Sequence, residues 1–452
     1  MRRLLLFVVL LILLAVVGVL VRSSRTADMT FFLGGIQVDE PDHEAWVRTL
    51  DEVGMNTVAV TVYARQGDWD TANLWFDDEA PWVVNEIRVA KSHGLKVVLV
   101  LRVALDHAFE RNKFFWHGMI MPRSAAQLGE WFDRYSIFVS RWATIAEQEG
   151  VDILAVGSEM NALTNTLEVD KLPVLEEYWS NEEKVRWEQE KVLAHSQEIE
   201  ERHLQVRGQE NYESLELFLG DEAAAHRQWA RQISWLEEED PLARINERRR
   251  HLETYWRRLI HNVRDVYDGR LTYAANFDQY EFVGFWDELD LLAINAYFPL
   301  RGSYEPDLSR DELATRLEAG WRGVLQRLDE FRRQQGIPRH RVLFSELGYV
   351  QRANSTIEPW ASTGFSVLPS TGGPRLVVWE DQPPDEAERA LAIRGLFNAN
   401  MALGGELLGG ILYWKLSTIP DHRQVEPFVL VIGGEGPEDP MLGELRRFTT
   451  GP

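Results

Sequence analysis

Apolar runs rich in β-branched residues alternate with helical patterns along this chain, and the number of such runs reaches eight. The runs are apolar almost throughout, as is typical of parallel strands that are covered on both faces. Repeated strand–helix units of this kind predict an α/β protein whose strands close into a (β/α)8 TIM barrel. The expected strands are Phe31–Ile36, Thr57–Tyr63, Lys96–Arg102, Ile153–Val156, Leu271–Ala275, Leu289–Ala293, Val342–Phe344 and Gly410–Trp414.

An open, doubly wound sheet is the structural alternative for a strand–helix alternation. That fold carries a glycine-rich phosphate loop after an early strand, and the sequence has no such loop. The length of 452 residues suits one large barrel with insertions. The barrel is therefore the favoured architecture.

The alternation stops between the fourth and the fifth expected strand. Residues 167–248 are rich in Glu, Gln and Arg, with scattered Trp, Tyr and Leu. This composition predicts long solvated helices, inserted into a barrel domain that spans residues 28–452. The insertion is also a candidate surface for a protein partner.

The N-terminus combines a positive charge with a long apolar segment. Arg2 and Arg3 precede an unbroken apolar run, Leu4–Val21, which is longer than the ~7–15 apolar residues of an ordinary signal peptide. It reaches the ~18 residues that indicate a membrane-spanning helix. We therefore interpret residues 1–27 as a signal anchor, or a cleavable signal peptide, with its linker. Both interpretations place the remainder outside the cytoplasm, either anchored to the membrane or secreted into the periplasm or medium.

The charge of the chain limits the class of partner. A formal net charge of -23 argues against a nucleic-acid binder, because binding to phosphates requires clustered Lys and Arg. The chain has no Cys, and its His residues lack the spacing of metal ligands. The sequence therefore predicts neither a metal site nor a cofactor.

Two expected strands end in glutamates. Glu159 follows the fourth strand and Glu346 follows the seventh, each in a turn with a nearby Gly. Barrel enzymes build their active sites at the C-terminal ends of the strands, and a pair of carboxylates is the minimal equipment for cleaving a glycosidic bond. The other strand ends supply amide, aromatic and cationic side chains, which suit the hydroxyls and C–H faces of a sugar. These side chains are Gln37, Tyr63, Arg102, Asn276, Asn295, Tyr297 and Trp414.

Several of these segments resemble glycoside hydrolase family 113, which belongs to a large clan of retaining (β/α)8 hydrolases and is known for β-1,4-mannanases. The resemblance covers roughly residues 31–164 and 264–416 and leaves the charged insertion unmatched. The wider clan usually has Asn directly before the acid/base, where this chain has Ser158, and family 113 tolerates a small residue there. The segments that carry the resemblance are Gly157-Ser158-Glu159-Met160, Tyr273-Ala274-Ala275-Asn276-Phe277, Phe285-Trp286-Asp287, Asn295-Ala296-Tyr297-Phe298-Pro299-Leu300 and Ser345-Glu346-Leu347-Gly348-Tyr349.

The resemblance implies a role for individual residues. It implies Glu159 as the acid/base and Glu346 as the nucleophile of a retaining reaction. Tyr297 is expected beside the nucleophile, Asn276 near the sugar and Trp414 as a stacking platform. Trp116, in the segment Trp116-His117-Gly118, resembles part of a substrate-contacting loop. The remaining substrate-binding candidates are Asn295, which stands where the family often has Asp, and Tyr63.

The expected activity is hydrolysis of a β-mannan-like or related β-linked polysaccharide or oligosaccharide. Two alternatives stay open at this point. The first is a non-catalytic carbohydrate-binding or envelope-assembly protein that has kept the barrel. The second is a transglycosylase that uses the same two glutamates.

Overall fold

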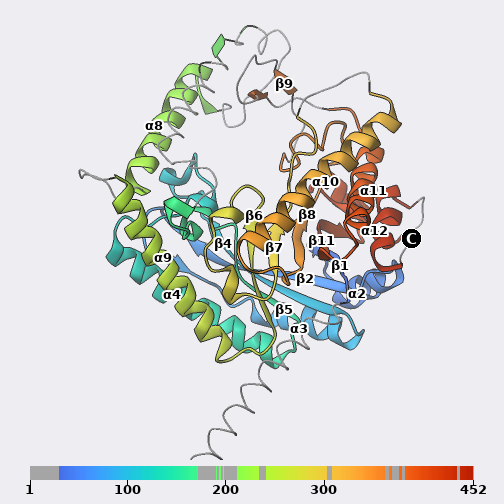
Figure 1. Cartoon of the computed structure of the whole chain (residues 1–452), viewed down its shortest axis with the longest axis horizontal. Helices are drawn as coiled ribbons and strands as arrows, with labels where there is room; N and C mark the ends of the chain where they lie inside the picture. The colour runs from blue at the N-terminus through green and yellow to red at the C-terminus, as the bar shows by residue number, and fades with distance from the viewer. Residues whose placement is uncertain are drawn as a thin grey trace, which may run out of the picture.

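Eight parallel strands close into a barrel at the centre of the computed structural model (Figure 1). The described residues are 30–171, 190, 193, 194, 197, 211–233, 241–302, 308–361, 366–368, 376–378, 382–434 and 438–450. Each barrel strand pairs with the next one, and β1 pairs with both β2 and β11, which closes the sheet. The strands are β1 (Phe32–Gln37), β2 (Thr57–Gln66), β4 (Lys96–Leu105), β5 (Ile153–Ser158), β6 (Arg270–Asn276), β7 (Leu292–Asn295), β8 (Val342–Leu347) and β11 (Leu408–Ser417). The predicted (β/α)8 barrel is confirmed.

Every barrel strand differs from its expected bounds by one to three residues at one or both ends. β2 and β4 each continue three residues further, and these residues pair with each other as far as Gln66 and Leu105. β7 begins at Leu292 instead of Leu289, because Trp286–Glu288 form a 3-10 turn that ends at Leu289. An apolar run therefore located each strand, while pairing with neighbours determined its length.

The barrel interior is filled by side chains from all around the closed sheet. Small and branched residues such as Ala59, Val98 and Ala155 meet there, together with Leu343 and Leu412. A second and larger core lies between the outside of the sheet and the helices. Both faces of the strands are thus buried, which explains why their sequences are apolar almost throughout.

Helices that run back along the outside of the barrel cover the sheet. Side-chain caps define several of their starts: Ser124 caps α4, and Ser309 and Glu312 form a capping box on α10. α10 packs against α11, and α11 against α12. The helices are α2 (His43–Glu52), α3 (Ala80–Ser92), α4 (Ala125–Gln148), α9 (Pro241–Arg264), α10 (Arg310–Gln334), α11 (Glu386–Ala402) and α12 (Pro440–Thr450).

Part of the expected insertion lies within the described residues. α8 (Leu215–Ile233) belongs to it and stands with α9 at the left of Figure 1. α9 begins at Pro241, ahead of the predicted insertion end at residue 248, and it packs against α4 as a helix of the barrel. Short elements complete the chain: a turn of helix, α5 (Asn161–Thr164), and the small strands β3 (Leu74–Trp75), β9 (Ser366–Leu368), β10 (Leu376–Val378) and β12 (Leu430–Val431).

In the part of the chain that the structure describes, no helix combines the length and apolar character needed to cross a membrane. The run Leu4–Val21, on which the predicted anchor or signal peptide rests, lies outside the described residues.

Candidate active site

Glu159 and Glu346 emerge from the C-terminal ends of β5 and β8. Glu346 is the second-to-last residue of strand β8. Gly348 lets the chain pass close to β11, since a Cβ there would meet the Trp414 carbonyl oxygen at 2.4 Å. Glu159 directly follows β5 and has a positive φ of 52°, a conformation that is strained for a residue with a Cβ. Its backbone N–H donates to the Ala274 carbonyl at 2.9 Å. Barrel closure therefore directs both carboxylates to the same place.

One guanidinium group joins the two carboxylates. Arg102 of β4 donates from Nη2 to Glu159, and its Nη1 lies 2.9 Å from Glu346 Oε1. All three side chains are buried. Because the two Nη atoms belong to one planar group, the carboxylates must be near neighbours.

Neighbouring side chains hold the glutamates in place. The Tyr297 hydroxyl donates to Glu346 Oε2 at 2.8 Å. Asn295 links the two glutamate turns: its Nδ2 donates to Ser158 Oγ at 3.3 Å, and its Oδ1 accepts from Ser345 Oγ at 2.8 Å. Asn295 is fully buried, so its hydrogen bonds act within the protein.

His117 contacts Glu159 from the loop that follows β4. Its Nε2 lies 3.1 Å from Glu159 Oε2. Trp116 precedes it, with 37% of its surface exposed, and the two rings meet edge to face at 4.9 Å. The predicted loop residue Trp116 therefore packs against the residue that contacts Glu159.

The other predicted residues surround the same centre. Trp414 packs beneath the Arg102 guanidinium, 5.3 Å from the ring centroid, and Lys415 Nζ lies 4.1 Å from the same ring. Burial raises the pKa of the Tyr63 hydroxyl, and the charge of the neighbouring Arg102 opposes this effect. Asn276 turns its Oδ1 back to accept from the Phe277 N–H at 2.9 Å. In the described residues, no group of His, Asp and Glu is arranged to hold a metal ion.

A family model for Glycoside Hydrolase Family 113 matches residues 34–170 and 243–366, which is more than half of the chain. The chain belongs to this family. Both glutamates, Arg102, His117 and Tyr297 lie within the matched residues, whereas α8 lies in the gap between them. This family 113 protein is therefore a glycoside hydrolase.

Solved structures of the same family share its fold. The family 113 β-mannanase AaManA from Alicyclobacillus acidocaldarius, in complex with ManMIm, has a TM-score of 0.56 and 17% identity, with 94% of this chain and 98% of that chain covered. A structure described as a family 113 β-1,4-mannanase has the same TM-score and 16% identity, with coverage of 94% and 99%. No curated protein sequence matches the chain.

The carboxylates of Glu159 and Glu346 titrate as a pair because they are close and buried. Burial raises the pKa of Glu346 to about 7, since the ionised Glu159 adds to the effect and the attraction of Arg102 offsets it only in part. Burial acts on Glu159 as well, but Arg102, His117 and Asn295 outweigh it and hold the pKa of Glu159 well below its usual range. The pair therefore keeps one proton up to about neutral pH.

Three basic residues of this site are not singled out by the sequence pattern. Arg102 appeared among the strand ends without a role, and His117 was grouped with scattered histidines. Lys415, which follows Trp414, was missed. Charge balance is the signal that could have found Arg102, because two buried carboxylates require a buried cation.

We expect Arg102→Met to destabilise the protein by about 3–5 kcal/mol, because it leaves two buried carboxylates without their cation. Without Arg102 the pKa values of both carboxyls rise in the folded state, while in the unfolded state they stay near 4.3. The loss of stability should therefore grow as the pH rises above that value. Urea unfolding at pH 5 and pH 8 measures it.

Arg134→Met is the matched control, since Arg134 pairs with Glu130 on the exposed surface of α4. It should behave as wild type at both pH values. An equal loss of stability at pH 5 and pH 8 in Arg102→Met would contradict the charge-balance explanation.

Proposed function

We propose that this protein is a retaining β-glycoside hydrolase, with Glu159 as the acid/base and Glu346 as the nucleophile. The observation that carries the proposal is the binding of both carboxylates to adjacent nitrogens of Arg102. Retaining enzymes hold their carboxyl groups about 5–5.5 Å apart, whereas inverting enzymes leave about 6.5–9.5 Å for a water molecule. Two carboxylates that share one guanidinium favour the closer arrangement.

The proposed reaction proceeds in two steps. The Glu346 carboxylate attacks the anomeric carbon while Glu159 gives its proton to the departing glycosidic oxygen, which forms a covalent glycosyl-enzyme. A water molecule then attacks the anomeric carbon as Glu159 takes its proton, and Glu346 is released. Tyr297 supports the role of Glu346, because its hydroxyl donates to the carboxylate at 2.8 Å and lowers the pKa of that group.

In the free enzyme the shared proton lies on Glu346. The proposed mechanism requires it on Glu159, which acts as the acid. In the unliganded site the pKa of Glu346 is raised and that of Glu159 is lowered. The proposed mechanism therefore requires substrate binding to weaken the contacts of Arg102 and His117 with Glu159. The proton can then pass to Glu159, and Glu346 becomes the ionised nucleophile.

Exposed aromatic rings support a polymeric β-linked substrate. Trp360 is 44% exposed and stacks on Phe277, with 5.3 Å between the centroids and 15° between the ring planes. Phe277 and Trp414 both pack against the cluster that contains Tyr297. Flat aromatic faces suit the C–H faces of sugars, so Trp414 and Trp360 offer platforms for successive sugar units. The structural similarity to β-1,4-mannanases makes a β-mannan-like glycan the substrate that we propose.

We expect Glu159→Gln to lower kcat/KM on β-1,4-manno-oligosaccharides by about 10²–10⁴-fold, because the general acid is lost. A dinitrophenyl glycoside, whose leaving group needs no proton, should still form the glycosyl-enzyme in this variant. Glu346→Ala should lose turnover of both substrates. Steady-state kinetics, with NMR of the product anomer for wild type, measures these effects.

Glu86→Gln is the matched control, because Glu86 is a buried carboxyl on α3 whose pKa burial also raises to about 7. It should retain wild-type rates. Wild-type activity in Glu159→Gln or Glu346→Ala would refute the assignment. Binding without turnover by wild type would favour a non-catalytic protein, and products longer than the substrate would favour a transglycosylase.

The pH profile provides a separate test of the shared proton. On oligosaccharides, kcat/KM should fall as the pH rises through about 7, where the pair loses its last proton. On the dinitrophenyl glycoside this fall should be absent, since formation of the glycosyl-enzyme then needs only the ionised nucleophile. The same alkaline fall with both substrates would contradict the shared-proton explanation.

The apolar run Leu4–Val21 supports a second proposal, that the catalytic barrel works outside the cytoplasm. A membrane anchor predicts activity in the membrane fraction of cells that express the full chain, and a cleaved signal peptide predicts activity in the soluble exported fraction. Activity confined to the cytosol would refute export.

A further inference from the structure

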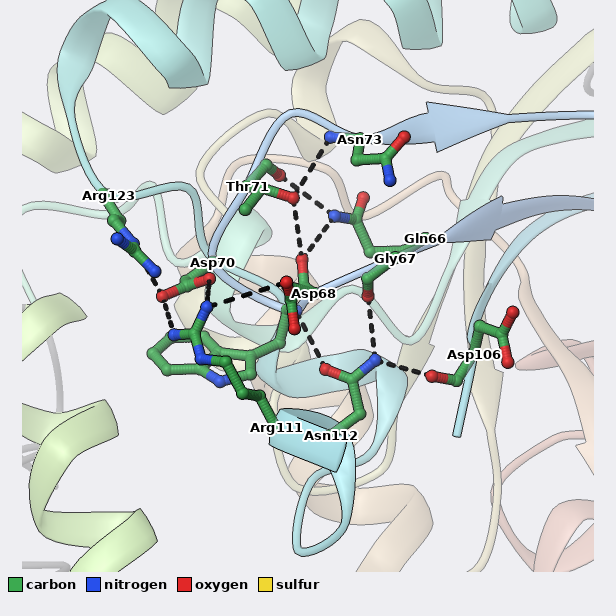
Figure 2. Close-up of polar contacts among 11 residues, drawn as sticks. Gln66, Gly67, Asp68, Asp70, Thr71, Asn73, Asp106, Arg111, Asn112 and Arg123 are labelled. Atoms are coloured by element: carbon green, nitrogen blue, oxygen red, sulfur yellow. Dashed lines mark hydrogen bonds and ion pairs between the residues drawn. The ribbon is translucent and has the colours of Figure 1, made fainter. Parts of the chain in front are cut away.

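The loop between β4 and α4 carries Trp116 and His117, and a buried aspartate clamps its two stems. Asp70 accepts from Arg111 Nη1 at 2.8 Å on one stem and from Arg123 Nε at 2.8 Å on the other (Figure 2). Asp70 is fully buried, and these hydrogen bonds hold its pKa below the usual range although burial opposes them. The base of the loop is therefore fixed to the segment that follows β2.

Backbone contacts and an amide side chain reinforce this base. Asn112 accepts from the Trp69 N–H at 3.0 Å and donates to the Gly67 and Asp106 carbonyls, as Figure 2 shows in part. The Met121 N–H donates to the Trp69 carbonyl at 2.9 Å. These bonds fix the stems of the loop, and the Trp69 ring also packs against Phe115 of the tip, residues 113–119, with centroids 5.1 Å apart.

α8 contacts that tip from outside the barrel. The indole Nε1 of Trp229, a buried residue of α8, donates to the Met119 carbonyl at 2.8 Å. Two further aromatic pairs connect the same surfaces: Phe218 with Phe114, and His226 with Phe115, each with centroids 5.8 Å apart. Since α8 lies outside residues 34–170 and 243–366, this support comes from the segment that the family model does not match.

The tip is packed so that a small displacement of Met119 would also move His117, which contacts Glu159. His117 and Met119 belong to one 3-10 turn, in which the Met119 N–H donates to the Trp116 carbonyl at 2.9 Å. A Cβ on Gly118 would meet the Trp116 ring at 2.3 Å, so the indole lies directly over this turn. Movement of Met119 would therefore carry Trp116 and His117 with it.

We propose that α8 positions the loop tip, and that it thereby sets how Trp116, a residue that the family resemblance already places in a substrate-contacting loop, meets the sugar on the leaving-group side of the cleft. The proposal rests on the proposed function. Glu159, as acid, must contact the glycosidic oxygen, and His117 lies 3.1 Å from its carboxylate. The exposed Trp116 ring beside His117 is thus placed to contact the departing sugar. Trp229 acts as a positioning residue, because its hydrogen bond is made to the Met119 carbonyl of the loop tip and not to either carboxylate.

Trp229→Phe tests this role, because it removes the hydrogen bond to Met119 and keeps an aromatic ring in α8. We expect kcat/KM on β-1,4-manno-oligosaccharides to fall about 10–100-fold, as displaced positioning groups commonly cause. The dinitrophenyl glycoside has no leaving-group sugar and needs no acid, so its kcat/KM should be unchanged. Phe218→Leu, at the Phe114 contact, should show the same split and replaces Trp229→Phe if that variant fails to fold.

Trp286→Phe is the matched control. It removes a comparable hydrogen bond, from Trp286 Nε1 to the Tyr280 carbonyl at 3.0 Å, outside this loop. It should leave both substrates unaffected. An equal loss on both substrates in Trp229→Phe, or no loss on either, would overturn the proposal.

A wild-type protein that cleaves neither substrate would refute the proposed function, and the position of the tip would then be tested directly. Burial lowers the pKa of His117, against the opposing effect of Glu159. Loosening the tip should expose the imidazole and raise this pKa, which NMR of the ring protons measures in the unliganded protein. A pKa of His117 that is unchanged in Trp229→Phe would overturn the role of α8.

Discussion

The arrangement of this candidate active site depends on the compensation of buried charge by Arg102. Two carboxylates that lose their hydration inside a protein repel each other, and each carries a desolvation penalty of several kcal/mol. Arg102 contacts both and is itself buried. Its attraction to the two carboxylates outweighs burial and raises its own pKa well above the usual value. Arg102 by itself compensates one of the two negative charges, and burial raises the pKa of Glu346 to about 7, so the pair keeps a proton near neutral pH.

Other features of the site keep this charged group in one geometry. Glu159 has a positive φ, and such strain persists only where the surroundings impose it. Asn295 supplies part of that constraint, because it hydrogen-bonds to the serines that precede both glutamates. Tyr297 restrains Glu346, and the loop tip, supported by α8, restrains Glu159 through His117. The same contacts that bind the carboxylates therefore also set the distribution of the proton between them.

Much of the fold could be predicted from the sequence, because burial on both faces leaves a visible pattern. The eight apolar runs identified the barrel strands. The extensions of β2 and β4 could not be predicted, since those residues are strand only because they pair with each other. The late start of β7 follows from a 3-10 turn that helical or strand periodicity does not reveal.

The sequence by itself determined the barrel and the position of two glutamates at strand ends, because strand periodicity and strand order are local and countable properties. The tertiary structure alone decided what surrounds those glutamates. Arg102 and His117 approach Glu159 from 57 and 42 residues away, and Trp229 reaches Met119 across 110 residues. Such contacts depend on how loops and helices pack around a closed sheet, and no local pattern encodes that packing. The sequence revealed only that the insertion is rich in charged residues. Its proposed role depends on the tertiary contact between α8 and the loop tip.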